Sequence, residues 1–286
     1  MIYYYNHKTM DMYPQKEIEL FGYDGIVEFS ALHGMDPAKV FAEIKQLEEN
    51  IKNLNREPYD VSSGKYKQMM DYWLNRYVEF FNNGAKHGKQ AYVVIGNIAS
   101  GKSHTCDLIE KETGSIIVDA DRMKMGEMTD RGFYEGLSSL YTPLERDLVQ
   151  EPCSVAGKQL LDMVSSEGMD LILPKAPANY EKLERQLQML ENRGYDIHLI
   201  LVEAPIDICA SRSYVRYLKK ETAGNVYPNG IVEHGRFVPV SVVTYYGDRV
   251  YSTFAKAKGI GRYKSYTALY NDNSKSDRID IKTMAE

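Results

Sequence analysis

The chain has 286 residues, enough for about two domains at the usual size of roughly 150 residues each. Its composition, 43% hydrophobic and 26% charged, is that of an ordinary globular protein and argues against a disordered or fibrous chain. The net charge of -5 is spread along the sequence and provides no basic field for nucleic acid, and the longest apolar stretches, 92–96 and 197–202, are far too short to cross a bilayer.

The sequence is typical of a reducing compartment. Residues 1–8 show no basic start, no apolar stretch and no small-residue cleavage site. We therefore expect no secretory signal. Cys106, Cys153 and Cys209 are odd in number and widely spaced, which fits neither a disulfide framework nor a CxxC metal site. The six histidines show no HExxH or similar ligand spacing. We therefore expect a cytoplasmic protein whose histidines contribute to packing.

Residues 1–88 are predicted to form a mainly helical amino-terminal region. Asp36 followed by Pro37 indicates a helix start, because Asp caps a helix and Pro suits its first turn. A second apolar-rich stretch, 66–81, precedes a polar, glycine-containing linker at 82–88. Because both helices carry large apolar faces, we expect this region to dock on the rest of the chain or on a protein partner.

Residues 89–286 are predicted to form a doubly wound α/β domain with a five-stranded parallel sheet. From residue 90, short apolar runs alternate with amphipathic stretches, the pattern of a parallel sheet covered by helices. The expected strands are 91–95, 115–118, 169–173, 197–202 and 266–270. The expected helices are 102–112, 131–167 with a break at Pro152, 180–193, 206–220 and 240–258. The stretch 222–239 contains Gly and Pro and has the length of a functional loop, so we expect it to act as a lid.

A phosphate-binding loop is predicted between the first strand and the helix that follows it. The residues are Gly96, Asn97, Ile98, Ala99, Ser100, Gly101, Lys102 and Ser103, which fit the pattern G-x-x-x-x-G-K-[ST]. Glycines let the backbone wrap a phosphate, and the N–H groups and the helix end stabilise its charge. We expect Lys102 to reach the β- and γ-phosphates of ATP and the Ser103 hydroxyl to bind Mg²⁺. The alternative is an ordinary glycine-rich turn.

Two carboxylates follow the second expected strand. Asp119 and Asp121 lie at its carboxyl end, the edge where open α/β sheets bind ligands. If the chain stays extended, both side chains point the same way and share one site. We expect Asp121 to act as the general base that accepts the proton of an acceptor hydroxyl, and Asp119 to bind Mg²⁺ or a water molecule. The alternative is a pair of solvated loop acids.

Basic residues after the fourth strand are candidates for stabilising a transferred phosphoryl group. Arg212, Arg216 and Lys219 follow i, i+4, i+7 spacing along one helix, and Arg236 lies in the glycine-containing stretch that follows. Such stripes are usually solvated. The planar, always charged guanidinium is nevertheless suited to the charge of a phosphoryl group in transfer, so we expect Arg216 and Arg236 to act on it and Arg212 to contribute to nucleotide binding.

These residues together resemble the zeta-toxin family of P-loop kinases. The similarity covers residues 91–260 as an ordered series of motifs: GNIASGKS, IIVDADRMK, EGMDLIL, ENRGYDIHLILVEAP, SYVRY and GRFVP. The resemblance implies a doubly wound kinase fold, ATP with Mg²⁺, and phosphoryl transfer to a sugar hydroxyl of a UDP-activated amino sugar. It also implies that Asp121 is the catalytic aspartate and that Arg216 and Arg236 contact the transferred phosphate.

The chain departs from the family's pattern where the acceptor binds. The family commonly has Glu-Gly-Thr after the third strand, whereas this chain has Pro174-Lys175-Ala176, and Lys158 stands near a further glutamate position. The family's His-Pro pair after the aspartate is replaced by Met125-Gly126-Glu127. Because lysines suit phosphates or carboxylates rather than sugar hydroxyls, we expect Lys175 and Lys158 to bind an anionic acceptor. The alternative is that Lys175 belongs to a surface loop.

The sequence thus predicts an ATP-dependent kinase that phosphorylates a hydroxyl of a small metabolite, either nucleotide-linked or not. A polynucleotide kinase-like enzyme is an alternative, against which the acidic net charge argues. A second alternative is a non-catalytic nucleotide-binding switch. Whether the protein is an enzyme or a switch, its amino-terminal region is a candidate binding surface for a protein partner or an antitoxin. Retention of Lys102, Asp121 and the arginines favours turnover.

Overall fold

The computed structural model divides the chain into two compact units. It describes residues 34–39, 42, 63–81, 84–125, 151–177, 180–219 and 240–271. One unit, here called the sheet unit, comprises 75–119, 157–209 and 244–286, and the second unit comprises 1–74, 120–156 and 210–243. The division into folding domains at residue 88 stays a prediction.

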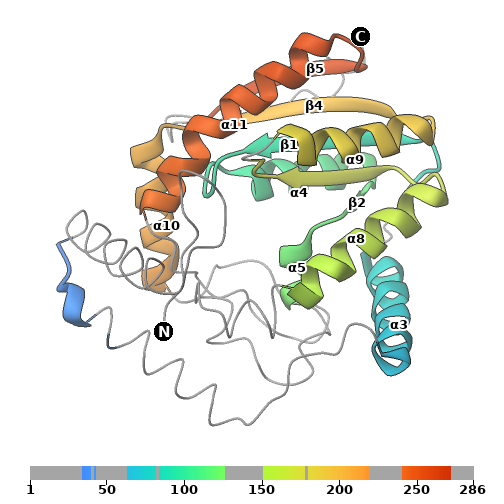
Figure 1. Ribbon diagram of the computed structural model, residues 1–286, viewed down its shortest axis with the longest axis horizontal. Helices are drawn as coiled ribbons and strands as arrows, with labels where there is room; N and C mark the ends of the chain where they lie inside the picture. Colours follow the sequence, from blue (N-terminus) through green and yellow to red (C-terminus); the bar gives the residue numbers. More distant parts are fainter. Residues whose placement is uncertain are drawn as a thin grey trace. The chain divides into compact units, whose positions relative to one another are not determined.

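The sheet unit is built on the predicted parallel sheet. Its strands are β1 (Gln90–Gly96), β2 (Ile116–Ile117), β3 (Leu171–Lys175), β4 (Asp196–Glu203) and β5 (Ser265–Tyr270). They are joined in the order β2-β3-β1-β4-β5, with parallel pairing throughout (Figure 1). The order places β1 in the centre, so the loop that follows β1 lies at the middle of the carboxyl edge. This arrangement confirms the doubly wound α/β fold predicted from the apolar runs.

Helices connect and cover the strands. They are α3 (Gly64–Phe81), α4 (Lys102–Thr113), α5 (Ala120–Met125), α8 (Glu151–Ser166), α9 (Tyr180–Asn192), α10 (Ile206–Lys219) and α11 (Val240–Ile260). Within the sheet unit, α4 and α9 lie on opposite faces of the sheet (Figure 1). On the α4 face, Cys106 and Ile109 pack against Tyr92 and Val94 of β1. The intervening residue Val93 is also fully buried, as a central strand covered on both faces requires.

No helix among the described residues combines the length and apolarity needed to span a membrane. The three cysteines are all buried, and none of them is in a disulfide.

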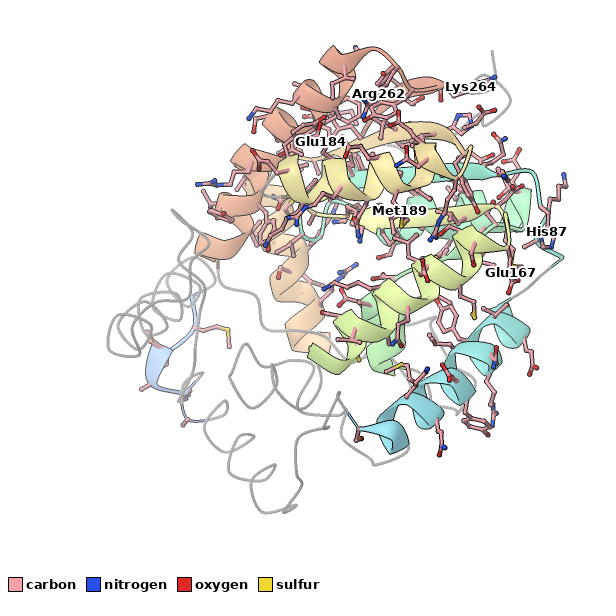
Figure 2. The ribbon with its side chains drawn as sticks, turned by 45° about the vertical axis from the view of Figure 1, so that its right-hand side comes forward. His87, Glu167, Glu184, Met189, Arg262 and Lys264 are labelled. Carbon is pink, nitrogen blue, oxygen red and sulfur yellow. The ribbon has the colours of Figure 1, made fainter. Side chains whose placement is uncertain are left out.

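The predicted linker at 82–88 is bonded to the amino edge of the sheet along its described part. Asp170 is 5% exposed, and its Oδ1 accepts hydrogen bonds from the backbone N–H groups of Gly88 and Gln90, both at 2.9 Å. His87 Nδ1 donates to the Glu167 carbonyl at 2.9 Å, and Figure 2 shows these two residues side by side. The segment is thus anchored to the turn between α8 and β3.

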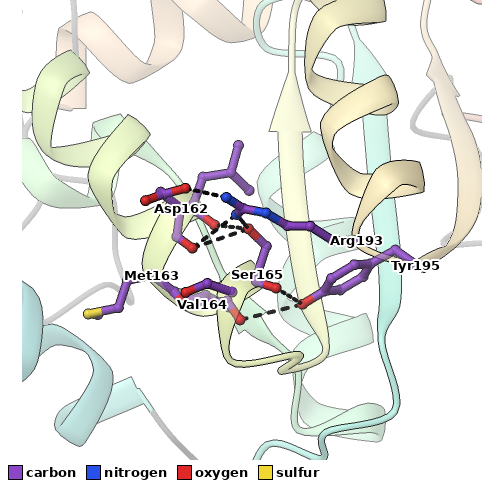
Figure 3. Close-up of polar contacts among 8 residues, drawn as sticks. Asp162, Met163, Val164, Ser165, Arg193 and Tyr195 are labelled. Atoms are coloured by element: carbon purple, nitrogen blue, oxygen red, sulfur yellow. Dashed lines mark hydrogen bonds and ion pairs between the residues drawn. The ribbon is translucent and has the colours of Figure 1, made fainter.

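A polar network at the same edge joins the end of α8 to the start of β4 (Figure 3). The Tyr195 hydroxyl donates to the Met169 carbonyl at 2.8 Å, and Arg193 forms an ion pair with Asp162 at 2.5 Å. Arg193 also donates to the Ser165 hydroxyl. Since Asp162 is 68% exposed, water screens the ion pair and its contribution to stability is small, about 0–1 kcal/mol.

The amino-terminal helix start is confirmed. Asp36 Oδ1 accepts a hydrogen bond from the Ala38 N–H at 3.0 Å, and residues 37–39 are helical. In α3, Met70 is fully buried, and the Tyr77 hydroxyl donates to the Ile117 carbonyl at 2.7 Å. The second half of α3 is thereby attached to β2 through its tyrosine, as expected of an apolar helix that docks.

Candidate functional site: a phosphate-binding loop

The chain between β1 and α4 curls into a compact loop. The Ser100 N–H donates to the Asn97 carbonyl at 3.2 Å, and Thr105 N–H donates to the Gly101 carbonyl at 3.1 Å, the first bond of α4. Ala99 has φ 58° and Gly101 has φ 105°, both in the left-handed region. This path turns the backbone sharply before the helix begins, leaving the N–H groups of the first helical turn available to an anion.

Two glycines of the motif have no room for a side chain. A Cβ on Gly96 would lie 2.6 Å from Ser100 Oγ and 2.8 Å from the Val202 carbonyl oxygen. A Cβ on Gly101 would overlap Asn271 Nδ2, and its φ angle is one that L residues rarely adopt. The sequence motif is therefore matched by a loop whose backbone is packed as closely as phosphate wrapping requires.

The polar side chains of the loop are held close to its backbone. Lys102 Nζ donates to the Asn97 carbonyl at 2.5 Å, so the ammonium group lies across the loop from the helix start. Asn97 is 1% exposed, and its Oδ1 accepts a hydrogen bond from the Ile98 N–H at 2.7 Å. Ser103, the predicted Mg²⁺ ligand, is exposed in the first turn of α4. Lys102 and Ser103 therefore begin the helix directly at the loop, as the motif predicts.

The conformation expected around Asp119 and Asp121 is partly wrong. The strand pairing continues through Val118, whose N–H donates to the Ile172 carbonyl at 2.8 Å, and half-buried Asp119 follows. Helix α5 then begins at Ala120, which places Asp121 in its first turn rather than in an extended loop. The alternation of side chains along an extended strand therefore does not apply to Asp119 and Asp121, and it gives no reason for their side chains to point the same way. The two residues belong to different compact units.

The basic residues are only partly described. Arg212 is half-buried and Arg216 exposed on α10, while Arg236 and the predicted lid 222–239 lie outside the described residues. The segment of α10 within the second unit buries Ala210 and Ser213. The catalytic roles of the arginines remain predictions.

Lys175 lies in a strand, contrary to the alternative of a surface loop. The turn after α8 includes Gly168 at φ 72°, and it delays the start of β3 by two residues relative to the expected 169–173. Lys175 is consequently the last residue of β3, paired in register with Ile95 of β1 and half-buried. It therefore stands one residue before the level of Gly96, where the phosphate loop begins. Lys158 is exposed on α8.

Two residues that hold the loop were missed by sequence reasoning. Asn271, directly after β5, donates from Nδ2 to the Ser100 carbonyl at 2.9 Å. Gly247 of α11 lies close to the Asn97 side chain of the loop. A Cβ on Gly247 would be 3.1 Å from Asn97 Nδ2 and 2.9 Å from Ile206 Cγ1. The place of Asn271 directly after the last expected strand was the one sequence signal for its contact with the loop. A residue that follows a strand lies at the carboxyl edge of a parallel sheet, where the loop also lies.

The parallel sheet, the central loop and its lysine define a P-loop kinase-like protein. The family model described as Zeta toxin matches residues 79–279. The chain therefore belongs to the zeta-toxin family, and the resemblance in its motifs is confirmed. No curated protein matches the sequence.

Solved structures share this fold at low sequence identity. A structure from the PezAT chromosomal toxin–antitoxin system of Streptococcus pneumoniae matches with a TM-score of 0.54 and 18% identity, covering 78% of this chain and 86% of the other. The AvrRxo1-ORF1:-ORF2 complex matches with a TM-score of 0.54 and 13% identity, covering 75% of this chain and 66% of the other. The AvrRxo1-ORF1:-ORF2 structure with ATP matches with a TM-score of 0.50 and 14% identity, covering 74% and 64%. This chain thus spans about two thirds of the AvrRxo1-ORF1:-ORF2 chain it matches.

Proposed function

We propose that this protein is an ATP-dependent phosphotransferase that moves the γ-phosphoryl group to a hydroxyl of a small metabolite. The observation that carries the proposal is the loop between β1 and α4, in which Gly96 and Gly101 leave no space for a side chain and Lys102 lies against the loop carbonyl of Asn97. Membership of the zeta-toxin family and the kinase-like fold support the same class of reaction.

The residues present fit a nucleotide with Mg²⁺. The loop N–H groups and Lys102 would hold the phosphates, and Ser103 and Asp119 would hold the metal ion, which in phosphate loops takes most of its remaining ligands from water and phosphate oxygens. Within the described ranges, no three or more His, Cys, Asp or Glu side chains gather in a way that could hold a metal ion. The bound ion would neutralise charge that develops on the phosphates.

Asp121 is the proposed general base. Its carboxylate, in the first turn of α5, would accept the acceptor's hydroxyl proton as the acceptor oxygen bonds to the γ-phosphorus. The bond between the γ-phosphorus and the β,γ-bridging oxygen breaks at the same time, and ADP leaves. Arg216 and Arg236 are proposed to bind the transferred phosphoryl oxygens, with Arg212 contributing to nucleotide binding. Lys102 would hold the β- and γ-phosphates in line with the hydroxyl.

Lys175 is proposed to contact an anionic group on an acceptor that is not the family's usual UDP-activated amino sugar. Lys175 supports this, since it ends β3 beside the start of the phosphate loop and replaces a family glutamate with the opposite charge. A lysine binds phosphate or carboxylate groups, whereas a glutamate binds sugar hydroxyls. Lys158 has weaker support because its position on α8 is exposed.

A protein partner is proposed for the region 1–88. One of the similar structures comes from a toxin–antitoxin system, and another is a complex of two products. An antitoxin-like protein that binds this region would regulate the enzyme.

Incubation of the protein with γ-labelled ATP, Mg²⁺ and a metabolite extract tests the proposal. We expect the label to move to a small anionic organic compound, and EDTA to abolish the transfer. UDP-N-acetylglucosamine and a 5′-hydroxyl oligonucleotide serve as alternative acceptors. Efficient labelling of the former restores the family's usual acceptor, and labelling of the latter favours a polynucleotide kinase. ATP binding without transfer to any of the three favours a nucleotide-binding switch.

A further inference from the structure

The residue after the last strand is tied both to the sheet and to the phosphate loop. The Asn271 N–H donates to the Glu203 carbonyl at 2.7 Å, which continues the β4–β5 pairing by one residue. Its side-chain Nδ2 donates to the Ser100 carbonyl at 2.9 Å, 171 residues away in the sequence. The amide is thus held by a rigid strand, and it binds the loop at the peptide between Ser100 and Gly101.

This contact fixes the orientation of one peptide plane. The described peptide bonds are trans, and in a trans peptide the carbonyl and the following N–H point in opposite directions. Because the Ser100 carbonyl points to Asn271, the Gly101 N–H points to the other side of the plane, away from Asn271. If the peptide rotated by half a turn, the carbonyl oxygen would take the place of the N–H and would repel an anion.

Gly101 lets this peptide plane adopt more than one orientation, because glycine restricts its own backbone least. Gly101 has φ 105°, a region that glycine enters and leaves at little cost. Its α-carbon also approaches the Asn271 amide so closely that a Cβ would overlap Nδ2. The Asn271 hydrogen bond to the Ser100 carbonyl favours the one orientation that the structure shows.

We propose that Asn271 is a positioning residue for phosphate binding, which holds the Ser100–Gly101 peptide with its N–H available to the nucleotide's phosphates. The inference rests on the proposed function, because it presumes that this loop binds a nucleotide. Asn271 acts on the loop backbone, so its effect depends on the phosphates and not on the base.

Binding of ATP and of inorganic tripolyphosphate to the full-length protein tests this role. Asn271→Ala removes the donor, and Asn271→Asp keeps the size of the side chain but presents only acceptors to the Ser100 carbonyl. Ser265→Ala is the matched control. It removes the hydrogen bond between Ser265 Oγ and His198 Nδ1, 2.8 Å long, at the opposite end of the same strand. Melting temperatures without ligand report on the fold of each variant.

We expect Asn271→Ala to weaken ATP and tripolyphosphate by about the same factor, roughly fivefold for one hydrogen bond. Asn271→Asp should weaken both further, while Ser265→Ala binds both as the wild type does. Wild-type affinity in both Asn271 variants overturns the inference, as does weakening of ATP alone, which would make Asn271 a base contact. If Asn271→Ala does not fold, Asn271→Asp decides in the same way. Failure of the wild type to bind either ligand instead overturns the proposed function.

Discussion

Asp170 lies at the amino edge of the sheet and Asn271 at the carboxyl edge. The side chain of each forms hydrogen bonds with backbone groups that are distant in the sequence. Asp170 accepts two N–H groups of the chain itself, at Gly88 and Gln90, and so satisfies the protein's own donors. Asn271 binds a carbonyl of the phosphate loop, and the peptide it holds is left with an N–H directed elsewhere. The polar groups of the amino edge bind the protein's own backbone, whereas the carboxyl edge carries the loop that we propose to bind phosphate.

The comparison separates polar residues that stabilise the fold from polar residues that we propose to act on a ligand. At the amino edge, Arg193, Tyr195 and Asp170 bind groups that would otherwise lose their hydrogen bonds on folding. At the carboxyl edge, Lys102 lies on the loop's own carbonyl and Lys175 ends β3 beside it. Variants at the first edge should change stability and leave chemistry intact, and variants at the second should do the reverse.

The largest effect is expected for Lys102→Ala. The loop loses its point charge on the β- and γ-phosphates, so turnover should be abolished and ATP affinity lowered. Because Lys102 is not part of the core, the melting temperature should stay near that of the wild type. Titration with ATP and an activity assay check this prediction, and wild-type values in both would remove the assignment of the loop.

Asp121→Asn is expected to reduce turnover by about 10²–10⁴-fold, the usual contribution of a positioned general base. ATP binding should be unchanged, because the amide keeps the size of the side chain and loses only its ability to accept a proton. Single-turnover rates separate the two steps. Asp119→Asn is the matched control. If it loses the chemical step while Asp121→Asn retains it, the roles of the two carboxylates are exchanged.

Asp170→Ala should lower the free energy of unfolding by about 3 kcal/mol, since two backbone N–H groups lose a charged acceptor at a buried position. Urea unfolding measures the loss. At temperatures where the variant is folded, its ATP affinity should equal that of the wild type. A lowered affinity in the folded variant would contradict the separation of the two edges.

Lys175→Glu should raise the KM for the true acceptor by about tenfold, the effect of losing one charged contact worth about 1.4 kcal/mol. ATP binding should not change. Steady-state kinetics with the acceptor identified from the extract measure the split. Lys158→Glu serves as the comparison at an exposed site, and an equal effect of the two substitutions would argue for a general charge effect rather than a contact.

The smallest effect concerns His198, which lies 4% exposed in β4. It stacks on Tyr92, and its Nε2 donates to Gln90 Oε1 at 3.0 Å while its Nδ1 is 2.8 Å from Ser265 Oγ. Burial lowers the pKa of His198, an effect that nearby Asp196 opposes and Lys264 reinforces. As the pH falls, the unfolded chain therefore binds a proton at His198 before the folded protein does. The stability that depends on neutral His198 is complete above a pH of about 6.5 and is lost as the pH falls below that value.

Urea unfolding at pH 7.5 and 5.5 checks the sign. The wild type should lose more stability between these values than His198→Gln, which keeps a donor and an acceptor but does not titrate. Equal losses in the two proteins would show that His198 is protonated in the folded state as readily as in the unfolded state.

The sequence predicted the five parallel strands and the position of the glycine-rich loop after the first of them, because both follow from local patterns. Apolar runs such as 91–95 mark buried strands, and the loop motif is contiguous. The start of β3 was placed two residues too early because Met169 and Asp170 are buried in the turn that precedes the strand. Tyr195 and residues 86–90, which are distant in the sequence, bury that turn. An apolar sequence pattern alone does not distinguish such a buried turn from a buried strand.

Residues that act from a distance were not predicted. Asn271 and Gly247 are separated from the loop by more than a hundred residues, and only the folded sheet brings them to it. The extended path assumed between Asp119 and Asp121 was wrong because α5 begins at Ala120, a helix of six residues that is too short for a periodic signal.

Calorimetric titration of the intact protein with ATP in the presence of Mg²⁺ tests the central claim most directly. The account predicts one binding site, competed by inorganic tripolyphosphate and weakened in Lys102→Ala, with the fold of that variant intact. Absence of ATP binding by the folded wild-type protein, or binding that tripolyphosphate does not compete, would contradict the claim that the loop between β1 and α4 is a phosphate-binding site.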